Sequence, residues 1–579
     1  MADVEIYDCI IVGAGSSGSA LAGRLSENPR LKILLLEAGV DDRWIWFSIP
    51  LGAGYIWLRE RGLWRFHTEP ERFMAGRRMF WPRGRILGGT STVNGMLWVR
   101  GDPAEYDHWR DLGNAGWGYA DVLPFFKRME AYASGDPELR GRDGPIPITL
   151  LGSETLADAF NAACQQAGIP ATGDYNGRQY EGVGYLQANS KAGRRMGGRE
   201  TYLKKGRSRE NLTIITGARA RRVLVQNKRA TGVVYETPSG QRVAMAGREI
   251  ILCAGAVQTP QLLELSGIGN AELLKRHGIE VVHDLPGVGE NCRDHLHTRI
   301  SYECRRPITL NDIMRSPLRK AMMGARYMLT RGGHMAACTT QVHALAKTDA
   351  SLDRPDVKIQ MHNLSAADPR HPTEIRFDEF PGFGIGSFVL KPRSTGSIHI
   401  RSNDPEEPPA IIANYLADEH DRSTSIAALR LTRRIASQPS LQALIVREVR
   451  PGPGVDSDEE WLEHIAKLGA TSYHPTGTCK MGSDAMAVVD HRLRVRGIDG
   501  LRVADASIMP TIVSANPNAP CFMIGERCAQ FIFDDTQANF PGPNISGVDS
   551  TLRTPSAGKQ TLVSAGDSVT IALGDVAIS

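Results

Sequence analysis

Residues 7–39 read YDCIIVGAGSSGSALAGRLSENPRLKILLLEAG, and the order of patterns in them indicates how the N-terminal part of the chain folds. Residues 7–12 form an apolar run that predicts a buried parallel strand, and the following SALAGRLSE has helical spacing. Residues 32–36 form a second apolar run, which predicts the next strand. Strand, glycine turn, helix and strand in this order are typical of a Rossmann-like α/β domain.

Between the first strand and the helix, Gly13, Gly15 and Gly18 make a GxGxxG motif. Gly13 permits the tight turn, Gly15 lets the backbone approach a pyrophosphate, and Gly18 lets helix and strand pack closely. The start of the helix, with Ser16 and Ser17, offers unpaired N–H groups to phosphates. The motif therefore predicts a dinucleotide site.

Glu37, at the end of the second strand, supports the same prediction. Its carboxylate can accept a hydrogen bond from a ribose hydroxyl, and it disfavours a 2′-phosphate. A glycine-rich turn that binds no nucleotide is the alternative interpretation, and the agreement of strand, helix and acid argues against it. The motif by itself does not distinguish NAD from FAD.

A second glycine-rich stretch, FWPRGRILGGTSTVNGMLWVRGDPAEYDHW at residues 80–109, favours FAD. Gly84, Gly88 and Gly89 precede a Thr/Ser run and Asn94, so backbone N–H groups of this loop can contact a second large part of a cofactor. A second cradle suits a long ligand such as FAD. As a bare pattern, the stretch also fits a flexible loop.

The same stretch resembles the first signature of the glucose–methanol–choline (GMC) flavin oxidoreductases, and GAVQTPQLLELSGIG at 255–269 resembles the second. The segments PGVGENCRDH (286–295), YHPTGTCKMG (473–482) and LRVADASIMPTIVSANPNAP (501–520) follow in the family order. The resemblance extends from about residue 5 to about residue 535. It implies FAD-dependent oxidation of an alcohol, and it is nearest to the bacterial alcohol and choline dehydrogenase-like members.

The resemblance also implies an α/β fold with two domains. One is a Rossmann-like FAD-binding domain assembled from discontinuous segments, and the other is an α+β substrate-binding domain with an antiparallel sheet. The expected boundaries are residues 1–155, 200–305 and 470–540 for the FAD-binding domain, 156–199 and 306–469 for the substrate-binding domain, and 541–579 for a C-terminal tail. The tail holds no aromatic residue and is rich in Ser, Gly and Thr, so we expect it to be flexible.

The family pattern implies further contacts with FAD. The second glycine loop would follow the isoalloxazine and ribityl chain, the strand after NLTIIT would face the adenine, and ADAS would meet the pyrophosphate and ribityl region. The residues expected at FAD beyond the first motif are Gly89, Thr90, Asn94, Gly95, Leu97, Ala220, Asp505, Ala506 and Asn518. Some relatives bond the flavin covalently to a histidine just before the position of Asn94, where this chain has Val93. We therefore expect noncovalent FAD.

The stretch TSYHPTGTCKMG, residues 471–482, raises four interpretations for His474: metal ligand, part of a redox pair, catalytic base or ordinary loop histidine. A metal site would need three or four suitably spaced ligands, which this stretch lacks, and Cys479 has no resolving partner nearby. The resemblance implies that His474 is the general base, which removes the hydroxyl proton while the hydride leaves toward flavin N5. No metal is expected.

In SANPNAP, residues 514–520, the resemblance places Asn516 opposite His474 and Asn518 against the flavin. An asparagine can hold the substrate oxygen without competing for its proton. We therefore expect His474 to be the only group there that titrates near neutrality. The DHLH segment at 294–297 looks like a metal motif in isolation, but it falls in a family segment where we expect a structural role.

The substrate and the electron acceptor are the least determined. Gln341 stands where some relatives carry an acid that could face a cationic substrate, which favours a neutral primary alcohol over choline. YHPTGTCKMG and NPNAP favour a dehydrogenase over an oxidase, and the acceptor stays open between a quinone, an electron carrier and O2. The alternatives are an alcohol oxidase that produces hydrogen peroxide, a GMC-type lyase acting on hydroxynitriles, and a nucleotide-binding protein without catalysis.

Composition limits the partners. Hydrophobic content of 41%, charged content of 23% and a formal charge of +4 are those of a soluble globular protein and imply neither nucleic acid nor a membrane surface. No stretch approaches the roughly 18 apolar residues of a membrane span, and MADVEIYDC has no basic region typical of a cleaved signal. Nine cysteines without a CxxC pair fit a cytoplasmic protein. A homo-oligomer is compatible with the sequence.

Overall fold

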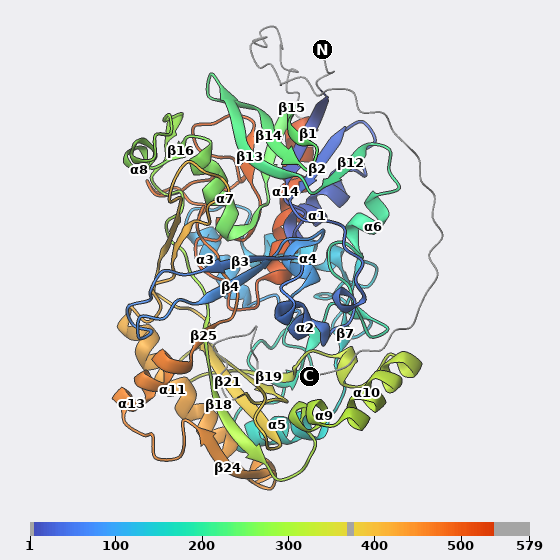
Figure 1. Ribbon diagram of the computed structural model, residues 1–579, viewed down its shortest axis with the longest axis vertical. Helices are drawn as coiled ribbons and strands as arrows, with labels where there is room; N and C mark the ends of the chain where they lie inside the picture. The colour runs from blue at the N-terminus through green and yellow to red at the C-terminus, as the bar shows by residue number, and fades with distance from the viewer. Residues whose placement is uncertain (1–4, 367–375, 538–579) are drawn as a thin grey trace. The chain divides into compact units, whose positions relative to one another are not determined.

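Two large sheets organise the chain, and the computed structural model describes them within residues 5–366 and 376–537 (Figure 1). The first sheet lies toward the top of Figure 1 and the second toward the bottom. The tail expected at 541–579 lies outside the described residues.

The first sheet is built around the strand predicted from the opening motif. β1 (Ile6–Val12) lies between β2 (Ile33–Glu37) and β15 (Gly240–Leu252) and runs parallel to both. β12 (Leu212–Thr216) continues the parallel order beyond β2, and β26 (Leu501–Val503) pairs with β15. Strands covered on both faces read as continuous apolar runs, and the CII segment of β1 is fully buried. The predicted Rossmann-like α/β fold is confirmed.

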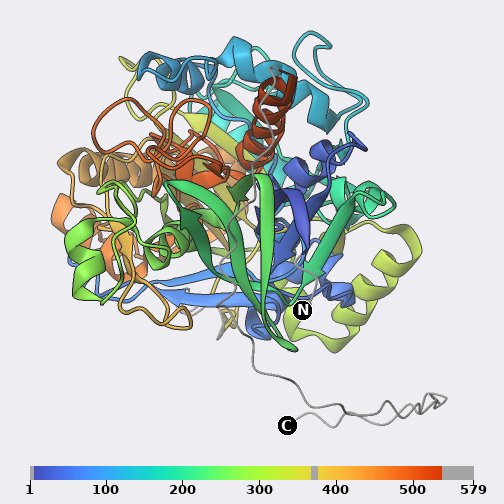
Figure 2. The ribbon, with the colours of Figure 1, turned by 90° about the horizontal axis from the view of Figure 1, so that it is seen from above.

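Beyond β15 the first sheet becomes antiparallel. β13 (Arg219–Gln226) and β14 (Arg229–Thr237) form an antiparallel meander with the first half of β15. The second half of β15 pairs with β1 in the parallel part. Figure 2 looks down on this sheet and shows the green strands of the meander spreading across the view, with the dark-red helix α14 (Asn518–Gln537) beyond them.

Helix α1 (Ser16–Leu25) follows β1 directly and packs against α14. A Cβ atom on Gly18 would lie 1.9 Å from the carbonyl oxygen of Gly13, and one on Gly525 would lie 2.3 Å from the carbonyl oxygen of Ser17. Any side chain at either position would force the backbone apart. The first close approach holds the start of α1 beside the end of β1, and the second lets α14 pack directly on α1.

The second sheet is antiparallel, as the sequence predicts for the substrate-binding part. Its strand order is β24, β18, β21, β20, β19, β8, with the short β25 paired to β18. The bounds are β8 (Gly182–Tyr185), β18 (Leu296–Cys304), β19 (Thr340–Ala346), β20 (Val357–His362), β21 (Gly382–Val389), β24 (Ile445–Arg450) and β25 (Ala470–Thr471). The predicted boundary at residue 305 grouped 296–304 with the FAD-binding segments, whereas β18 lies inside this second sheet.

Alternation gives the second sheet two different faces. Ile300, Ile359 and Ile385 are buried in the apolar cluster that packs on helices α5 (Thr155–Gln166) and α11 (Glu419–Ala436). The intervening positions are polar on β18 and β20 and include three glycines on β21. The polar face therefore points away from these two helices.

Other elements connect the sheets. The hairpin of β3 (Leu63–His67) and β4 (Phe80–Gly84) lies between them in Figure 1. The remaining helices of at least six residues are α2 (Gly52–Leu58), α3 (Pro103–Asp111), α4 (Tyr119–Met129), α7 (Gly255–Leu265), α8 (Ala271–Arg276), α9 (Leu310–Arg315), α10 (Pro317–Thr330) and α13 (Asp458–Leu468). Within the described ranges, no helix combines the length and the hydropathy needed to cross a bilayer.

Candidate functional site

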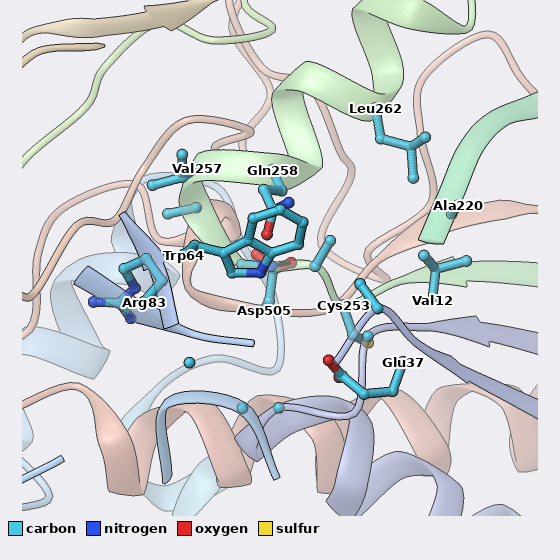
Figure 3. A pocket seen from close by; sticks show the side chains of 18 of the residues that line it. Val12, Glu37, Trp64, Arg83, Ala220, Cys253, Val257, Gln258, Leu262 and Asp505 are labelled. Atoms are coloured by element: carbon cyan, nitrogen blue, oxygen red, sulfur yellow. Dashed lines mark hydrogen bonds between the residues drawn. The ribbon is translucent and has the colours of Figure 1, made fainter. Parts of the chain in front are cut away.

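A cleft with about 1130 Å³ of space, part of it open to solvent, lies where the parallel strands of the first sheet end (Figure 3). Val12 ends β1, Glu37 ends β2, Cys253 follows β15 and Asp505 follows β26, and all four line the cleft. Ligands of open α/β sheets bind at this edge, beyond the carboxyl ends of the strands.

Most of the residues predicted for the cofactor line this cleft. They are Gly13, Gly15, Ser16, Ser17, Glu37, Gly89, Thr90, Ala220, Asp505 and Ala506. Gly18, Asn94, Gly95, Leu97 and Asn518 are absent from its lining.

The N-terminus of α1 faces the cleft without a side-chain cap. Gly15 is its N-cap residue, and a Cβ atom there would meet nothing within 4 Å. The second glycine loop closes on the same point, because a Cβ on Gly89 would lie 2.7 Å from the Cα atom of Gly15. Unpaired N–H groups beside open space can bind an anion, so the pyrophosphate contact expected from the sequence stays a prediction with room for it here.

Asn518 contacts the first residue of α1. Its Oδ1 accepts a hydrogen bond of 2.9 Å from Ser16 Oγ, and its buried Nδ2 has no partner among the described residues. A buried amide N–H without a partner is costly, so this donor fits a cofactor that supplies the missing acceptor.

Glu37 is buried at the end of β2, and Figure 3 shows its carboxylate at the wall of the cleft. Its Oε2 accepts from the N–H of Ala14 at 3.0 Å, and its Oε1 accepts from the N–H of Gly39 at 2.8 Å. Burial raises its pKa to about 7. The carboxylate is held rigidly for a hydroxyl donor such as a ribose.

Asp505 connects two segments at the edge of the cleft. Its Oδ2 accepts from the N–H of Gly255 at 2.8 Å and from Thr259 Oγ1 at 2.6 Å, so it caps the start of α7. Its Oδ1 accepts from the N–H of Ser507 at 2.8 Å. The carboxylate therefore holds α7 and the segment after β26 together at the cleft.

The predicted residues outside the lining have structural contacts. Asn94 Oδ1 accepts from the N–H of Met96 at 3.0 Å and from Arg195 Nη1 at 2.8 Å. Leu97 forms a β-bridge with Ala188. These contacts shape the second glycine loop from behind.

Some lining residues could not be found from the sequence motifs. Trp64 of β3 and Gln258 of α7 lie together in Figure 3, with Arg83 on one side of them and Ala220 farther away on the other. Pro475, which follows His474, also lines the cleft. A single aromatic or amide side chain in an ordinary strand or helix gives no sequence signal of this kind.

His474 is buried beside the cleft and is fixed at both backbone and ring. Its backbone N–H donates to Asp294 Oδ1 at 2.7 Å, and Arg83 Nη1 donates to the carbonyl oxygen of the preceding Tyr473 at 2.7 Å. Its ring lies 3.0 Å, Nε2 to Nδ2, from Asn516, as predicted for the catalytic pair, and 3.0 Å, Nδ1 to Nδ1, from His295. The DHLH segment thus supplies two direct neighbours of His474.

The hydrogen-bond chain determines the tautomers. His295 Nε2 lies 3.0 Å from the carbonyl oxygen of Leu390, which can only accept, so Nε2 carries the proton. Burial lowers the pKa of His295 to about 3, which keeps the ring neutral and leaves its Nδ1 as an acceptor. His474 therefore donates from Nδ1 and has its lone pair on Nε2, facing the amide of Asn516.

Burial is the main cause that lowers the pKa of His474 well below its usual value, and the cation of Lys358 adds to the effect. His474 is thus neutral and able to accept a proton. The expectation that it would be the only group titrating near neutrality is wrong. Burial lowers the pKa of Lys358, in the same network, to about 7.

Lys358 is the main neighbour of the His474–Asn516 pair that sequence reasoning missed. It is fully buried on β20, and its Nζ donates to Asn516 Oδ1 at 2.6 Å. Because an ammonium only donates, this bond turns the Nδ2 of Asn516 toward His474. The alternation in DVKIQMH signals a polar strand face but does not show what that face contacts.

Comparisons with known proteins identify the family. GMC oxidoreductase family models match residues 7–297 and 392–525. The chain is 42% identical over 536 residues to an oxygen-dependent choline dehydrogenase from Photobacterium profundum, covering 92% of this chain and 93% of the relative. It is 40% identical to the protein of the same name from Vibrio vulnificus, covering 91% and 94%.

Solved structures of other proteins support the same family assignment. Pyridoxine 4-oxidase from Mesorbium loti superposes with a TM-score of 0.83 at 31% identity, covering 91% of this chain and 99% of that one. Formate oxidase from Aspergillus oryzae superposes with a TM-score of 0.86 at 25% identity, covering 93% and 100%. This chain belongs to the GMC oxidoreductase family and is an FAD-dependent oxidoreductase that acts on CH–OH donors.

Proposed function

We propose that the protein oxidises a primary alcohol to an aldehyde, with His474 as the general base and Asn516 as its partner at the substrate oxygen. The contact between His474 Nε2 and the amide N–H of Asn516, beside the cleft, is the observation that supports this proposal most. Bound FAD would supply the hydride acceptor at flavin N5.

The two side chains divide the work on the hydroxyl group. His474 Nε2 accepts the hydroxyl proton, and Asn516 Nδ2 donates a hydrogen bond to the oxygen, on which negative charge develops. The proton makes His474 an imidazolium, which its Nδ1–H bond to His295 helps to hold in place. The low pKa of His474 in the absence of substrate keeps the base unprotonated until the alkoxide-like oxygen stabilises its charge.

The proposal includes noncovalent FAD. Val93 stands where a histidine would be needed for the covalent bond, and it is buried in an apolar cluster with Phe47 and Ile86. No nucleophilic side chain is available at that position.

We also propose a dehydrogenase of the cytoplasm whose electron acceptor is a quinone or another electron carrier rather than O2. The names of the curated relatives, oxygen-dependent choline dehydrogenases, support an alcohol dehydrogenase and keep O2 open as an acceptor. All nine cysteines are free thiols, which supports a reducing compartment.

Anaerobic mixing with a panel of primary alcohols tests the function. The purified yellow protein should lose its absorbance near 450 nm when an alcohol reduces it, and an aldehyde should form. A flavin that stays oxidised with every alcohol, including a hydroxynitrile that the protein cleaves, would contradict the proposal. Comparing turnover under air and with an artificial quinone then separates an oxidase from a dehydrogenase.

A further inference from the structure

The polar face of the second sheet is basic. Strand β20 presents Lys358, Gln360 and His362 on this face, and β18 presents His297 and Arg299. We call these five residues the basic face. It adjoins the proposed catalytic pair, because Lys358 binds Asn516.

Arg299 lies beside a position of β21 that has no side chain. It pairs with Gly386 of β21, and Gly386 pairs on its other side with Gln360. A Cβ atom on Gly386 would lie 2.8 Å from Arg299 Cγ and 2.3 Å from His297 Nε2. The glycine therefore leaves room for the arginine stem to lie over the strand.

The Arg299 guanidinium has no hydrogen bond or ion pair to any residue in the described ranges. Its backbone carbonyl accepts from His464, but none of its side-chain nitrogens has a partner there. Arg299 is half-buried as a residue, and burial lowers the pKa of its guanidinium to about 10. A planar fork of donors in this state matches a carboxylate, which it can bind through two parallel hydrogen bonds.

Lys358 also lacks a counter-ion among the described residues. Within the described ranges its only side-chain hydrogen bond is the one to Asn516 Oδ1, and its Nζ lies 5.9 Å from the ring centroid of Phe388. The ammonium is fully buried. Burying a cation without a partner is expensive unless a ligand brings the opposite charge.

Three carboxylates on or beside the second sheet are engaged elsewhere. Glu303, on the same face of β18, pairs with Arg447 of β24. Asp294 accepts from the backbone of His474 and from the hydroxyls of Thr471 and Tyr415. Glu154, at the margin of β19, accepts from Gln341 at 2.8 Å and pairs with His334.

Two further groups on the basic face have unused polar atoms. His297 Nε2 and Gln360 Oε1 are buried and have no hydrogen-bond partner in the described part of the chain. His297 is 6% exposed, and its unpartnered nitrogen lies over Gly386 beside the Arg299 stem. Unpartnered polar atoms around one guanidinium indicate a polar ligand group at this place.

We propose that the alcohol substrate carries a carboxylate, which Arg299 binds while its hydroxyl group meets His474 and Asn516. The proposal rests on the function proposed above. Lys358 adds positive charge between the two ends of the substrate. A quaternary ammonium alcohol such as choline would meet two cations of its own sign, so the chain differs in substrate class from the relatives named for choline.

The test compares matched alcohols on the FAD-loaded enzyme. The value of kcat/KM is measured anaerobically with an artificial acceptor. The substrates are short ω-hydroxycarboxylates of increasing chain length, their neutral amides and choline. The best hydroxycarboxylate should exceed its own amide by at least about tenfold, and choline should be the poorest of the three. Equal values for the carboxylate and the amide, or a preference for choline, would overturn the inference.

Variants locate the anion site. Arg299→Gln should reduce the carboxylate-to-amide ratio to within about twofold, whereas Arg299→Lys should keep part of it, because the charge remains and the fork is lost. Arg447→Gln, an exposed arginine on the neighbouring strand β24, is the matched control and should keep the wild-type ratio. A wild-type ratio in Arg299→Gln would contradict the assignment.

A binding measurement separates this inference from the proposed function. Butyrate, which cannot be oxidised at a hydroxyl, should perturb the flavin absorbance of the wild-type protein with saturation and should bind at least about tenfold more weakly to Arg299→Gln. If no alcohol reduces the flavin but butyrate binds in this way, the proposed function fails and the anion site stands. If alcohols reduce the flavin and butyrate does not bind, the anion site fails and the proposed function stands.

Discussion

The Nδ1 atoms of His474 and His295 lie 3.0 Å apart, so one ring must donate to the other. The carbonyl of Leu390 determines the direction by accepting from the far nitrogen of His295. The result is a single neutral tautomer of His474 with its lone pair on Nε2. His295 thus acts on the reaction through the orientation of the base.

Replacing His295 should slow flavin reduction without removing FAD. In His295→Phe, the Nδ1 of His474 loses its acceptor, both tautomers become populated and the imidazolium loses a partner. We expect the reduction rate constant to fall by about 10- to 100-fold, by analogy with the partners that orient metal-ligating histidines.

Stopped-flow absorbance near 450 nm measures this effect, and the pH profile of reduction should shift as well. His108→Ala, an exposed histidine of α3, is the control and should leave the rate unchanged. A wild-type rate and pH profile in His295→Phe would show that the contact has no role in positioning.

Lys358 should make stability depend on pH in a defined direction. Burial lowers its pKa to about 7, whereas an unfolded lysine titrates near about 10.4. Below the folded pKa the native state carries the full cost of the buried ammonium, and above the unfolded pKa the cost is absent. Its destabilising effect therefore diminishes as the pH rises from 7 to the unfolded value.

The variant Lys358→Met should therefore be more stable than wild type, and the gain should be larger at pH 6 than at pH 9.5. The two gains in the free energy of unfolding should differ by roughly 3 kcal/mol. Unfolding of the FAD-loaded proteins at the two pH values measures it. Lys467→Met, at an exposed position on α13, controls for the general effect of removing a charge. The same gain at both pH values would contradict the lowered pKa of Lys358.

The flavin should be released intact by acid. Val93 offers no group for a covalent bond, so trichloroacetic acid precipitation should leave a colourless pellet and all FAD in the supernatant. Absorbance and chromatography of the two fractions measure this. Yellow colour that stays with the precipitated protein would contradict noncovalent binding.

Local sequence patterns predicted the elements that form one side of the cleft, for a physical reason. The strand, glycine turn, helix and acid from Ile6 to Glu37 are adjacent in the chain, so hydrophobic periodicity and glycine geometry specify their arrangement directly. The contact of His474 with Asn516 joins two motifs that each carry a family pattern, and the structure brings them together.

The basic face was not predictable in the same way. Lys358 and Asn516 are 158 positions apart, and β18 reaches its place beside β21 through pairing of distant segments. Alternation in HTRIS and DVKIQMH indicates strands with one polar face, but pairing order decides that Arg299 and Lys358 face the same side. Only the folded sheet shows that both cations lack counter-ions among the described residues.

The central claim is that His474 is the general base, and its most direct test is the rate constant for flavin reduction in His474→Ala. We predict that anaerobic stopped-flow mixing with the best alcohol gives a value lower by at least about tenfold, with the FAD content unchanged. Asn516→Ala should show a smaller loss under the same conditions. An unchanged rate constant in FAD-loaded His474→Ala would contradict the claim.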